Sequence, residues 1–278
     1  MGRWQLAREM RRLRGDRPVA EVAKAMRMTV AAVHRWETAG PEGMVPSSGT
    51  MARLLEYYAI DGEEAAWLRH LREQARKRGW WQSYTVDKYY GTMIGLEETA
   101  SRIQLFGSQL VPGLLQTREY AHAVVRATCP DESADVIDQR VEVRMQRQKR
   151  WASAESPKLW AIVGETVIRQ RVGGTRVMAE QLTRMIELAD SPKLHLQVIP
   201  YSVGGHAALE ASAFQILRLD EIDLSVIYLE SRRSSLYLEE QADIDDYQNV
   251  FDHLRTAGLG TVQTRELLVK VRDEMRKE

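Results

Sequence analysis

The sequence predicts an α+β protein that consists of an N-terminal all-α bundle followed by a mixed α/β domain with about five strands. Apolar residues three and four positions apart run through roughly the first 80 residues, a spacing typical of amphipathic helices. Alternating or β-branched runs bounded by Gly, Pro and Ser occur further along the chain. The charge divides at the same place, because residues 1–81 contain 15 Lys and Arg against 10 Asp and Glu, whereas the remainder contains 24 against 29. We therefore expect one domain at residues 1–79 and a second at residues 80–278.

The N-terminal domain is expected to contain five short helices. The second begins after the break "GDRP", Thr29 is placed to cap the third, and the loop "AGPEGMVPSSG" ends it. After the fifth helix, Trp80 and Trp81 are interpreted as a hinge where one domain docks on the next, in preference to a pair that stacks on bases. The apolar faces of the five helices, in order, are Leu6, Met10 and Leu13; Val22, Ala23 and Met26; Val33 and Trp36; Met51, Leu54, Leu55 and Tyr58; and Leu68, Leu71 and Ala75.

The C-terminal domain is expected to mix helices with strands. Five runs are predicted as strands: "LWAIVG", "HLQVIP", "AFQILRL", "SVIYLE" and "SLYLE". A helix from Met178 to Ala189 separates the first two, which gives a strand-helix-strand unit, and the last three form a meander. Leu96, Ala100 and Ile103 indicate another helix before the first strand, and two more helices follow the last one.

Composition and motifs favour a cytoplasmic, non-enzymatic protein without a metal or cofactor. The start "MGRWQLAREM" lacks the apolar region of a signal peptide, and no run of about 18 apolar residues occurs, so neither secretion nor a membrane location is expected. Cys129 is the single cysteine, which rules out an intrachain disulfide and a cysteine-based metal cluster. The histidines show no His-Glu-x-x-His spacing, and neither a nucleophile elbow nor a Walker-type Gly-Lys-Ser/Thr occurs.

Two further patterns lie in the C-terminal half. His206 and Glu210 form the one acid–base pair of note, in a loop that could line a pocket. A hydrogen-bonded loop histidine is the preferred interpretation, and His206 is the candidate residue for a ligand or partner. One basic helix is interpreted as a solvated face, or as a clamp for the carboxylates of "LEEQADIDD", rather than as a second DNA site. Its arginines are Arg140, Arg144, Arg147 and Arg150.

The second and third helices form the arrangement that inserts an exposed helix into the major groove of DNA. The stretch "EVAKAMRMTVAAVHRWETAG" resembles the helix-turn-helix of the Xre and phage-repressor family, with residues 21–23 at its acidic-apolar-Ala signature and residues 35–37 at its polar-apolar-Glu run. It departs from that family at Arg27, where the turn usually has Gly. It departs again at Val19, where a Gln that contacts bases or phosphates is common, and by this position Val19 is included among the expected DNA-binding residues.

This resemblance implies which residues face the groove. Only Arg35 among them is long and polar, and it can pair bidentately with O6 and N7 of guanine. Val30, Ala31 and Ala32 can only contact thymine methyl groups or exclude other bases. The helix should therefore read a short, degenerate half-site. By position, the groove-facing residues are Thr29, Val30, Ala31, Ala32 and Arg35, with His34 beside them as a solvated polar residue.

A helix with so few hydrogen-bonding groups needs affinity from other contacts. Phosphate contacts supply affinity that is independent of sequence, and a dimer doubles the number of bases that are read. We therefore expect a homodimer on double-stranded DNA. The expected phosphate contacts are Arg14, Arg17, Lys24 and Arg27.

Several segments of the expected C-terminal domain carry another resemblance: "LFGSQLVPGLLQTREYA", "VGETVIRQRVGG", "VIPYSVGGHAALEASAFQIL" and "FDHLRTAGL". They resemble the C-terminal domain of a large actinobacterial family of regulators. As in WhiJ-like developmental regulators, its members join an Xre-type helix-turn-helix to this domain of unassigned chemistry. Many are encoded beside a small partner protein in a toxin-antitoxin-like pair, and the resemblance implies such a partner here.

These observations predict a sequence-specific transcription regulator whose C-terminal domain dimerises or receives a signal or a small partner protein. The alternative is an antitoxin-like protein that mainly sequesters a small partner and regulates its own operon. A third class, an enzyme or small-ligand sensor in the C-terminal domain, has the least support from the sequence.

Overall fold

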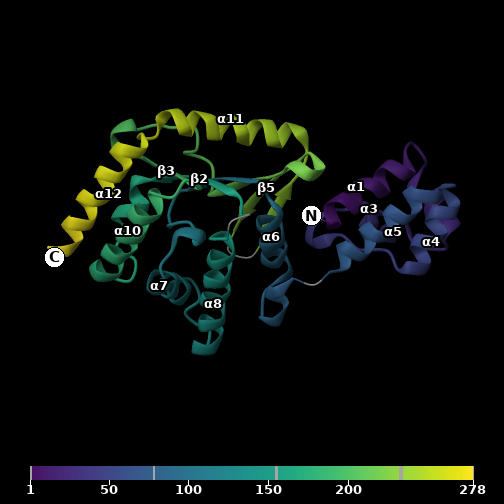
Figure 1. Ribbon diagram of the computed structural model, residues 1–278, viewed down its shortest axis with the longest axis horizontal. Coiled ribbons are helices and arrows are strands. Elements are labelled where there is room, and N and C mark those ends of the chain that lie inside the picture. Colours follow the sequence, from purple (N-terminus) through teal and green to yellow (C-terminus); the bar gives the residue numbers. More distant parts are fainter. Residues whose placement is uncertain (1, 78, 154–155, 232–233, 278) are drawn as a thin grey trace. The chain divides into compact units, whose positions relative to one another are not determined.

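A computed structural model describes residues 2–77, 79–153, 156–231 and 234–277 (Figure 1). The chain divides into two compact units, Met1–Gln82 and Ser83–Glu278. The short 3-10 helix Trp80–Ser83 spans this division, and the rings of Trp80 and Trp81 meet edge to face with centroids 6.0 Å apart. The docking role expected of the two tryptophans stays a prediction. In the part of the chain that the structure describes, no helix is long and apolar enough to cross a membrane.

The first unit is a bundle of α-helices around one apolar core. Each helix turns the predicted apolar face inward, and Leu6, Val22, Trp36, Leu54 and Leu68 are all buried in the same cluster. The predicted cap Thr29 accepts a hydrogen bond from a backbone N–H of its helix, and Ser47, which was not predicted as a cap, caps the next helix in the same way. The helices are α1 (Gly2–Arg14), α2 (Val19–Met26), α3 (Val30–Glu37), α4 (Ser48–Tyr57) and α5 (Gly62–Arg76).

The second unit is built on a mixed six-stranded sheet with the strand order β3-β2-β1-β4-β5-β6. Strands β1, β2 and β3 are parallel, whereas β4, β5 and β6 form an antiparallel meander that joins at β1. The predicted strand-helix-strand unit and the meander are both confirmed. The strands are β1 (Arg102–Gly107), β2 (Lys158–Gly164), β3 (Leu194–Ile199), β4 (Phe214–Leu219), β5 (Leu224–Glu230) and β6 (Ser235–Leu238).

The prediction of a helix through Ile103 was wrong. The helix ends at Thr99, and Ile103 lies in β1, which pairs with β2 on one side and with β4 on the other. The sheet therefore has one strand more than expected. Apolar residues at 96, 100 and 103 fit a helical spacing by coincidence, while Ile103 and Leu105 also fit the period of two that a strand requires.

Helices cover both faces of the sheet. Helix α11 runs along one face, while α6 and α8 lie on the other, with α7 against α8 (Figure 1). Helices α10 and α12 pack on each other and on β3. The helices of this unit are α6 (Lys88–Thr99), α7 (Arg118–Thr128), α8 (Ala134–Trp151), α9 (Glu165–Arg169), α10 (Thr175–Ala189), α11 (Gln241–Ala257) and α12 (Thr261–Arg276).

Candidate DNA-binding surface and C-terminal cavity

The turn between α2 and α3 is held by the backbone. The Arg27 N–H donates to the Lys24 carbonyl at 3.1 Å, and the Met28 N–H donates to the Ala23 carbonyl at 2.9 Å. This pair of bonds is a Schellman motif, which requires a left-handed residue after the helix. Arg27 takes that role with φ 52° and ψ 45°, although it has a Cβ. The turn geometry therefore survives without the usual glycine, at some conformational cost.

Helix α3 begins with its cap and turns one face to solvent. Thr29 Oγ1 accepts a hydrogen bond from the Ala32 N–H at 3.2 Å. Val30 is 43% exposed, and Ala31, His34 and Arg35 are exposed as well. The expected readers therefore share one accessible face, with two exceptions.

The two exceptions are Ala32 and Val19. Ala32 is buried in the core with Val33 and Trp36, so its assignment to the groove-facing set was wrong. The reason is helical geometry, because residues 32, 33 and 36 fall on one side of α3 and that side packs on the bundle. Val19, at the start of α2, is half-buried and packs against the same core.

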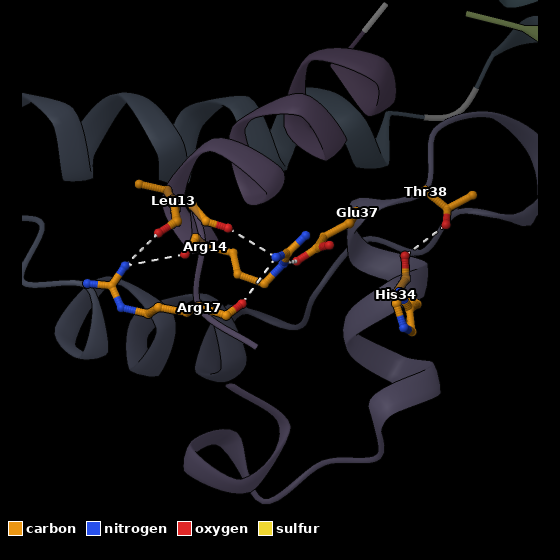
Figure 2. Close-up of polar contacts among 7 residues, drawn as sticks. Leu13, Arg14, Arg17, His34, Glu37 and Thr38 are labelled. Carbon is orange, nitrogen blue, oxygen red and sulfur yellow. Dashed lines mark hydrogen bonds and ion pairs between the residues drawn. The ribbon is translucent and has the colours of Figure 1, made fainter. Parts of the chain in front are cut away.

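The cations of the first unit fall into two groups. Lys24, Arg27 and Arg35 are exposed and form no hydrogen bond or ion pair through their side chains with any residue that the structure describes. Arg14, in contrast, donates from Nε to Glu37 Oε1 at 2.7 Å and from Nη1 to the carbonyls of Gly15 and Arg17 (Figure 2). The hydrogen bond to Glu37 raises the pKa of Arg14, and Glu37 itself is buried. Arg14 therefore ties the end of α1 to the end of α3.

Arg17 and His34 are also exposed, and each has contacts within the first unit. Arg17 Nη1 donates to the carbonyls of Leu13 and Arg14 at 3.3 and 3.4 Å (Figure 2). The Arg17 guanidinium also lies over the Tyr58 ring, 5.5 Å from its centroid. These contacts hold Arg17 near the start of α2 while it remains exposed. The His34 carbonyl accepts from the Thr38 hydroxyl at 2.8 Å, and that bond supports the last turn of α3.

We define the recognition surface as eight exposed residues before α2, on α2, in the turn and on α3: Arg17, Lys24, Arg27, Thr29, Val30, Ala31, His34 and Arg35. It combines solvated cations with one apolar patch. Cations of this kind can neutralise phosphates and release counterions, and a short apolar patch can contact thymine methyl groups. Sequence reasoning placed these residues, apart from Ala32, on one surface.

His206 lies in the wall of a cavity of about 780 Å³ in the second unit. Its ring meets Phe106 edge to face with centroids 6.0 Å apart, and its Nδ1 accepts from the Ala208 N–H at 3.3 Å. Glu210 also lines the cavity, but no bond joins it to His206 among the described residues. The hydrogen-bonded loop histidine is thus the arrangement observed. The sequence did not indicate the polar groups on the opposite wall.

That opposite wall comes from α8 and from the sheet. Arg147 is buried and donates from Nε and Nη2 to the two Glu97 oxygens at 2.9 and 2.6 Å, while its Nη1 donates to the Tyr90 hydroxyl. Burial alone would lower the pKa of Arg147, but Glu97 and Tyr90 raise it above its ordinary value. The interpretation of this helix as a solvated face or a clamp for residues 238–246 was wrong for Arg147. Arg140 and Arg150 instead pair with Glu132 and Glu98.

Comparisons with known proteins agree with the division into two units. Residues 5–68 match a family model described as a helix-turn-helix domain, which places the chain in the class of helix-turn-helix proteins and supports DNA binding. Residues 90–270 match the model of a domain of unknown function, DUF5753. The chain belongs to this DUF5753 family, whose match covers most of its length. No curated protein and no solved structure matches the chain.

Proposed function

We propose that this protein is a sequence-specific DNA-binding transcription regulator that acts as a dimer. We also propose that its domain from about residue 80 onward receives a signal or a small partner protein. The observation that carries the DNA-binding proposal is the exposed face of α3, which presents Val30, Ala31 and Arg35 to solvent, with no side-chain partner for Arg35 among the described residues. The match to a helix-turn-helix domain supports it independently.

Arg35 is the main base reader in this proposal. Its guanidinium is solvated and uncommitted, so it loses no internal bond when it pairs with guanine O6 and N7. Val30 and Ala31 are exposed beside it and suit thymine methyl groups. One half-site therefore offers few discriminating contacts.

Phosphate contacts come from Arg17, Lys24 and Arg27 in this proposal. Each is exposed, and none is bound to a carboxylate among the described residues. Arg14 is a weaker candidate, because a phosphate would have to compete with Glu37 for its guanidinium. Its position at the junction of α1 and α3 favours a structural role.

Dimerisation follows from the scarcity of base contacts. Each base pair contributes about 1–3 kcal/mol of discrimination, so a single half-site read by one arginine is poorly specified. Two half-sites about one helical turn apart, or 34–36 Å, would supply the rest. Analytical ultracentrifugation with and without operator DNA tests this, and a monomer under both conditions would overturn the dimer.

The resemblance to actinobacterial WhiJ-like regulators supports a second candidate function. In that case the protein is antitoxin-like, binds mainly a small partner protein, and uses its DNA-binding unit to regulate its own operon. The DUF5753 match spans residues 90–270, a region that a module for reading DNA alone does not need. Its size also supports a second role. If the partner alters operator affinity, operator DNA must alter partner affinity by the same factor, because coupling is reciprocal.

The test of DNA reading begins with operators selected from random duplex DNA by the purified protein. Arg35→Ala should cost roughly 1–3 kcal/mol on the selected site and relax preference at one position, as loss of a bidentate base contact does. Arg17→Ala should weaken binding to all sequences alike and lower the salt dependence by about one phosphate contact. Arg69→Ala, an exposed arginine on α5, is the matched control and should leave binding unchanged.

Two results would contradict the assignment. If Arg35→Ala weakened binding to selected and random DNA equally, Arg35 would be a phosphate contact and not a base reader. If the wild-type protein enriched no sequence at all, the proposed sequence-specific function would be wrong.

A further inference from the structure

Two buried polar atoms and one accessible carboxylate in the 780 Å³ cavity have no hydrogen-bond partner among the described residues. Arg144 donates from Nη1 to Gln116 Oε1 at 2.7 Å, but its buried Nε has no hydrogen-bond partner. Gln215 Oε1 is also buried without a partner. The Glu230 carboxylate forms no hydrogen bond with any residue that the structure describes. Buried polar atoms in folded proteins are almost always bonded, so Arg144 Nε and Gln215 Oε1 call for an explanation, whereas the exposed Glu230 carboxylate is open to a ligand or to water.

The fold brings these three groups to one end of the cavity. Gln215 of β4 lies opposite Tyr228 of β5 in register, and Glu230 follows Tyr228 by two residues. Side chains two residues apart on a strand share a face, so the three residues project from the same side of the sheet. Arg144 lines the same cavity from α8, a helix that lies with α6 on one face of the sheet (Figure 1).

Two guanidinium groups lie close together in this part of the cavity. A Cβ placed on Gly113 would lie 3.6 Å from both Arg144 Nε and Arg147 Nη1, so the two guanidinium groups converge beneath that glycine. Glu97 binds Arg147 through both of its oxygens, which leaves Arg144 without a bonded carboxylate. Desolvation by the surrounding protein raises the pKa of Glu230, with Arg147 and Arg144 opposing that rise. Glu230 and Arg144 both line the cavity, but no hydrogen bond or ion pair joins them among the described residues.

Apolar side chains also line the cavity. Leu105 of β1 lies opposite Gln215 in register, so the two share a face of the sheet, and Met93, Val111 and Val124 line the cavity as well. The cavity lies past the carboxyl ends of the parallel strands β1, β2 and β3, whose terminal residues Gly107, Gly164 and Ile199 all border it. Ligands of open sheets with parallel strands commonly bind at this edge. A volume of about 780 Å³ is in the range of small-molecule sites.

We propose that this cavity binds a small organic acid that carries at least one hydroxyl or amino group and an apolar body. The carboxylate of the ligand binds the free edge of Arg144, because a guanidinium fork matches a carboxylate with two parallel N–H bonds. The hydroxyl or amino group donates to Gln215 Oε1 and to Glu230. The apolar body packs against Leu105, Val111 and Val124.

Binding at this site is independent of the proposed function. The use of the bound acid as the signal that the C-terminal domain receives rests on that function. Direct binding measurements therefore test the cavity, and operator titrations test the regulation. A protein that binds the acid without enriching any DNA sequence would retain the site and lose the proposed function.

The experiment uses the full-length protein and isothermal titration calorimetry. The probes are L-phenylalanine, L-leucine, phenyllactate, 2-hydroxyisocaproate and 4-hydroxybenzoate, each titrated to about 10 mM so that even a Kd near 1 mM is measured. Each acid is paired with its primary amide, which keeps the shape and removes the charge. Inorganic phosphate is the anion without an apolar body. At least one acid should bind, with its amide and phosphate at least tenfold weaker.

Variants locate the site. Arg144→Gln should weaken the binding acid at least tenfold, whereas Arg150→Gln, an exposed arginine on the same helix, should not change its Kd. Gln215→Leu should weaken the binding of acids that carry a donor group. It should weaken the binding of benzoate less, because benzoate, titrated for this comparison, carries no donor group. Near-UV circular dichroism and Tm show that each variant is folded, and Gln215→Leu keeps the test valid if Arg144→Gln does not fold.

Three outcomes would overturn the proposal. The first is that no acid in the panel binds, which would leave water to satisfy the three groups. The second is equal affinity for acids, amides and phosphate, which would indicate unspecific association. The third is an unchanged Kd in both Arg144→Gln and Gln215→Leu, which would place the bound acid elsewhere.

Discussion

The recognition surface and the C-terminal cavity both contain polar groups without partners among the described residues. The two regions differ in whether water can solvate those groups. Arg35 and Arg27 are exposed, so water solvates them and their lack of partners costs no stability. Arg144 Nε and Gln215 Oε1 are buried, and an unbonded buried group costs about 1–3 kcal/mol. An unpaired cation on a surface is therefore ordinary. Unpaired groups in a cavity are expensive enough to indicate a use.

The same contrast exists within helix α8. Arg144 and Arg147 are neighbours on one face of the helix, and both border the cavity. Arg147 is bonded on all sides, by Glu97, Tyr90 and the Met93 sulfur, whereas Arg144 has one bonded edge. Arg147 therefore has a structural role, and Arg144 remains available to a ligand.

The largest expected effect comes from breaking the buried ion pair. Arg147→Met should lower the free energy of unfolding by about 3–5 kcal/mol, because it leaves Glu97 buried without a counter-charge. Adding Glu97→Leu should recover most of that loss, since removing both charges also removes both desolvation penalties. Urea denaturation of the single and double variants measures both values. A double variant no more stable than Arg147→Met would show that the pair contributes packing rather than charge.

A smaller effect is expected from two glutamines in different environments. Gln215→Leu should raise the stability of the unliganded protein by about 1 kcal/mol or more, because it removes a buried acceptor without a partner. Gln116→Leu should lower stability, because Gln116 is buried and bonded to both Val111 and Arg144. Thermal unfolding of the two variants compares them directly. Equal losses of stability in the two variants would mean that the Gln215 amide is hydrogen-bonded in solution. The polar groups of the cavity would then have partners.

The smallest expected effect concerns the turn between α2 and α3. Arg27→Gly should be more stable than Arg27→Ala by up to about 1 kcal/mol, because both remove the charge but only glycine adopts the left-handed conformation without strain. Both variants should lose the same affinity for DNA if Arg27 contacts a phosphate. Chemical denaturation and filter binding separate the two contributions. Equal stability of the two variants would show that the turn relaxes when the side chain is shortened.

How much could be predicted differs between the two sites. The recognition surface was predictable because a capped short helix and its apolar spacing determine which residues point outward. Ala32 was misplaced because an alanine fits the core as readily as the surface, and only the packing of α3 on the bundle decides between them. Arg14 was likewise expected at a phosphate, yet Glu37, far along the chain, accepts its hydrogen bond.

The cavity could not be predicted, because its parts come from distant segments. Arg144, Gln215 and Glu230 meet through a sheet in which β1 pairs with β4, and β1 was itself taken for the end of a helix. Nothing in the local sequence marks Gln215 as unbonded or Arg147 as buried. Burial and hydrogen bonding at these residues depend on how distant segments of the chain pack around them.

The sequence by itself determined the two-part α+β organisation, the helices of the first unit, the strand-helix-strand unit and the meander, since periodicity and caps act over a few residues. Tertiary structure alone decided the central place of β1, the pairing of Arg147 with Glu97 and the unsatisfied end of the cavity. The physical reason is that strand pairing and charge burial depend on contacts between residues far apart in sequence. Local patterns cannot rank these contacts, because each residue type is compatible with several of them.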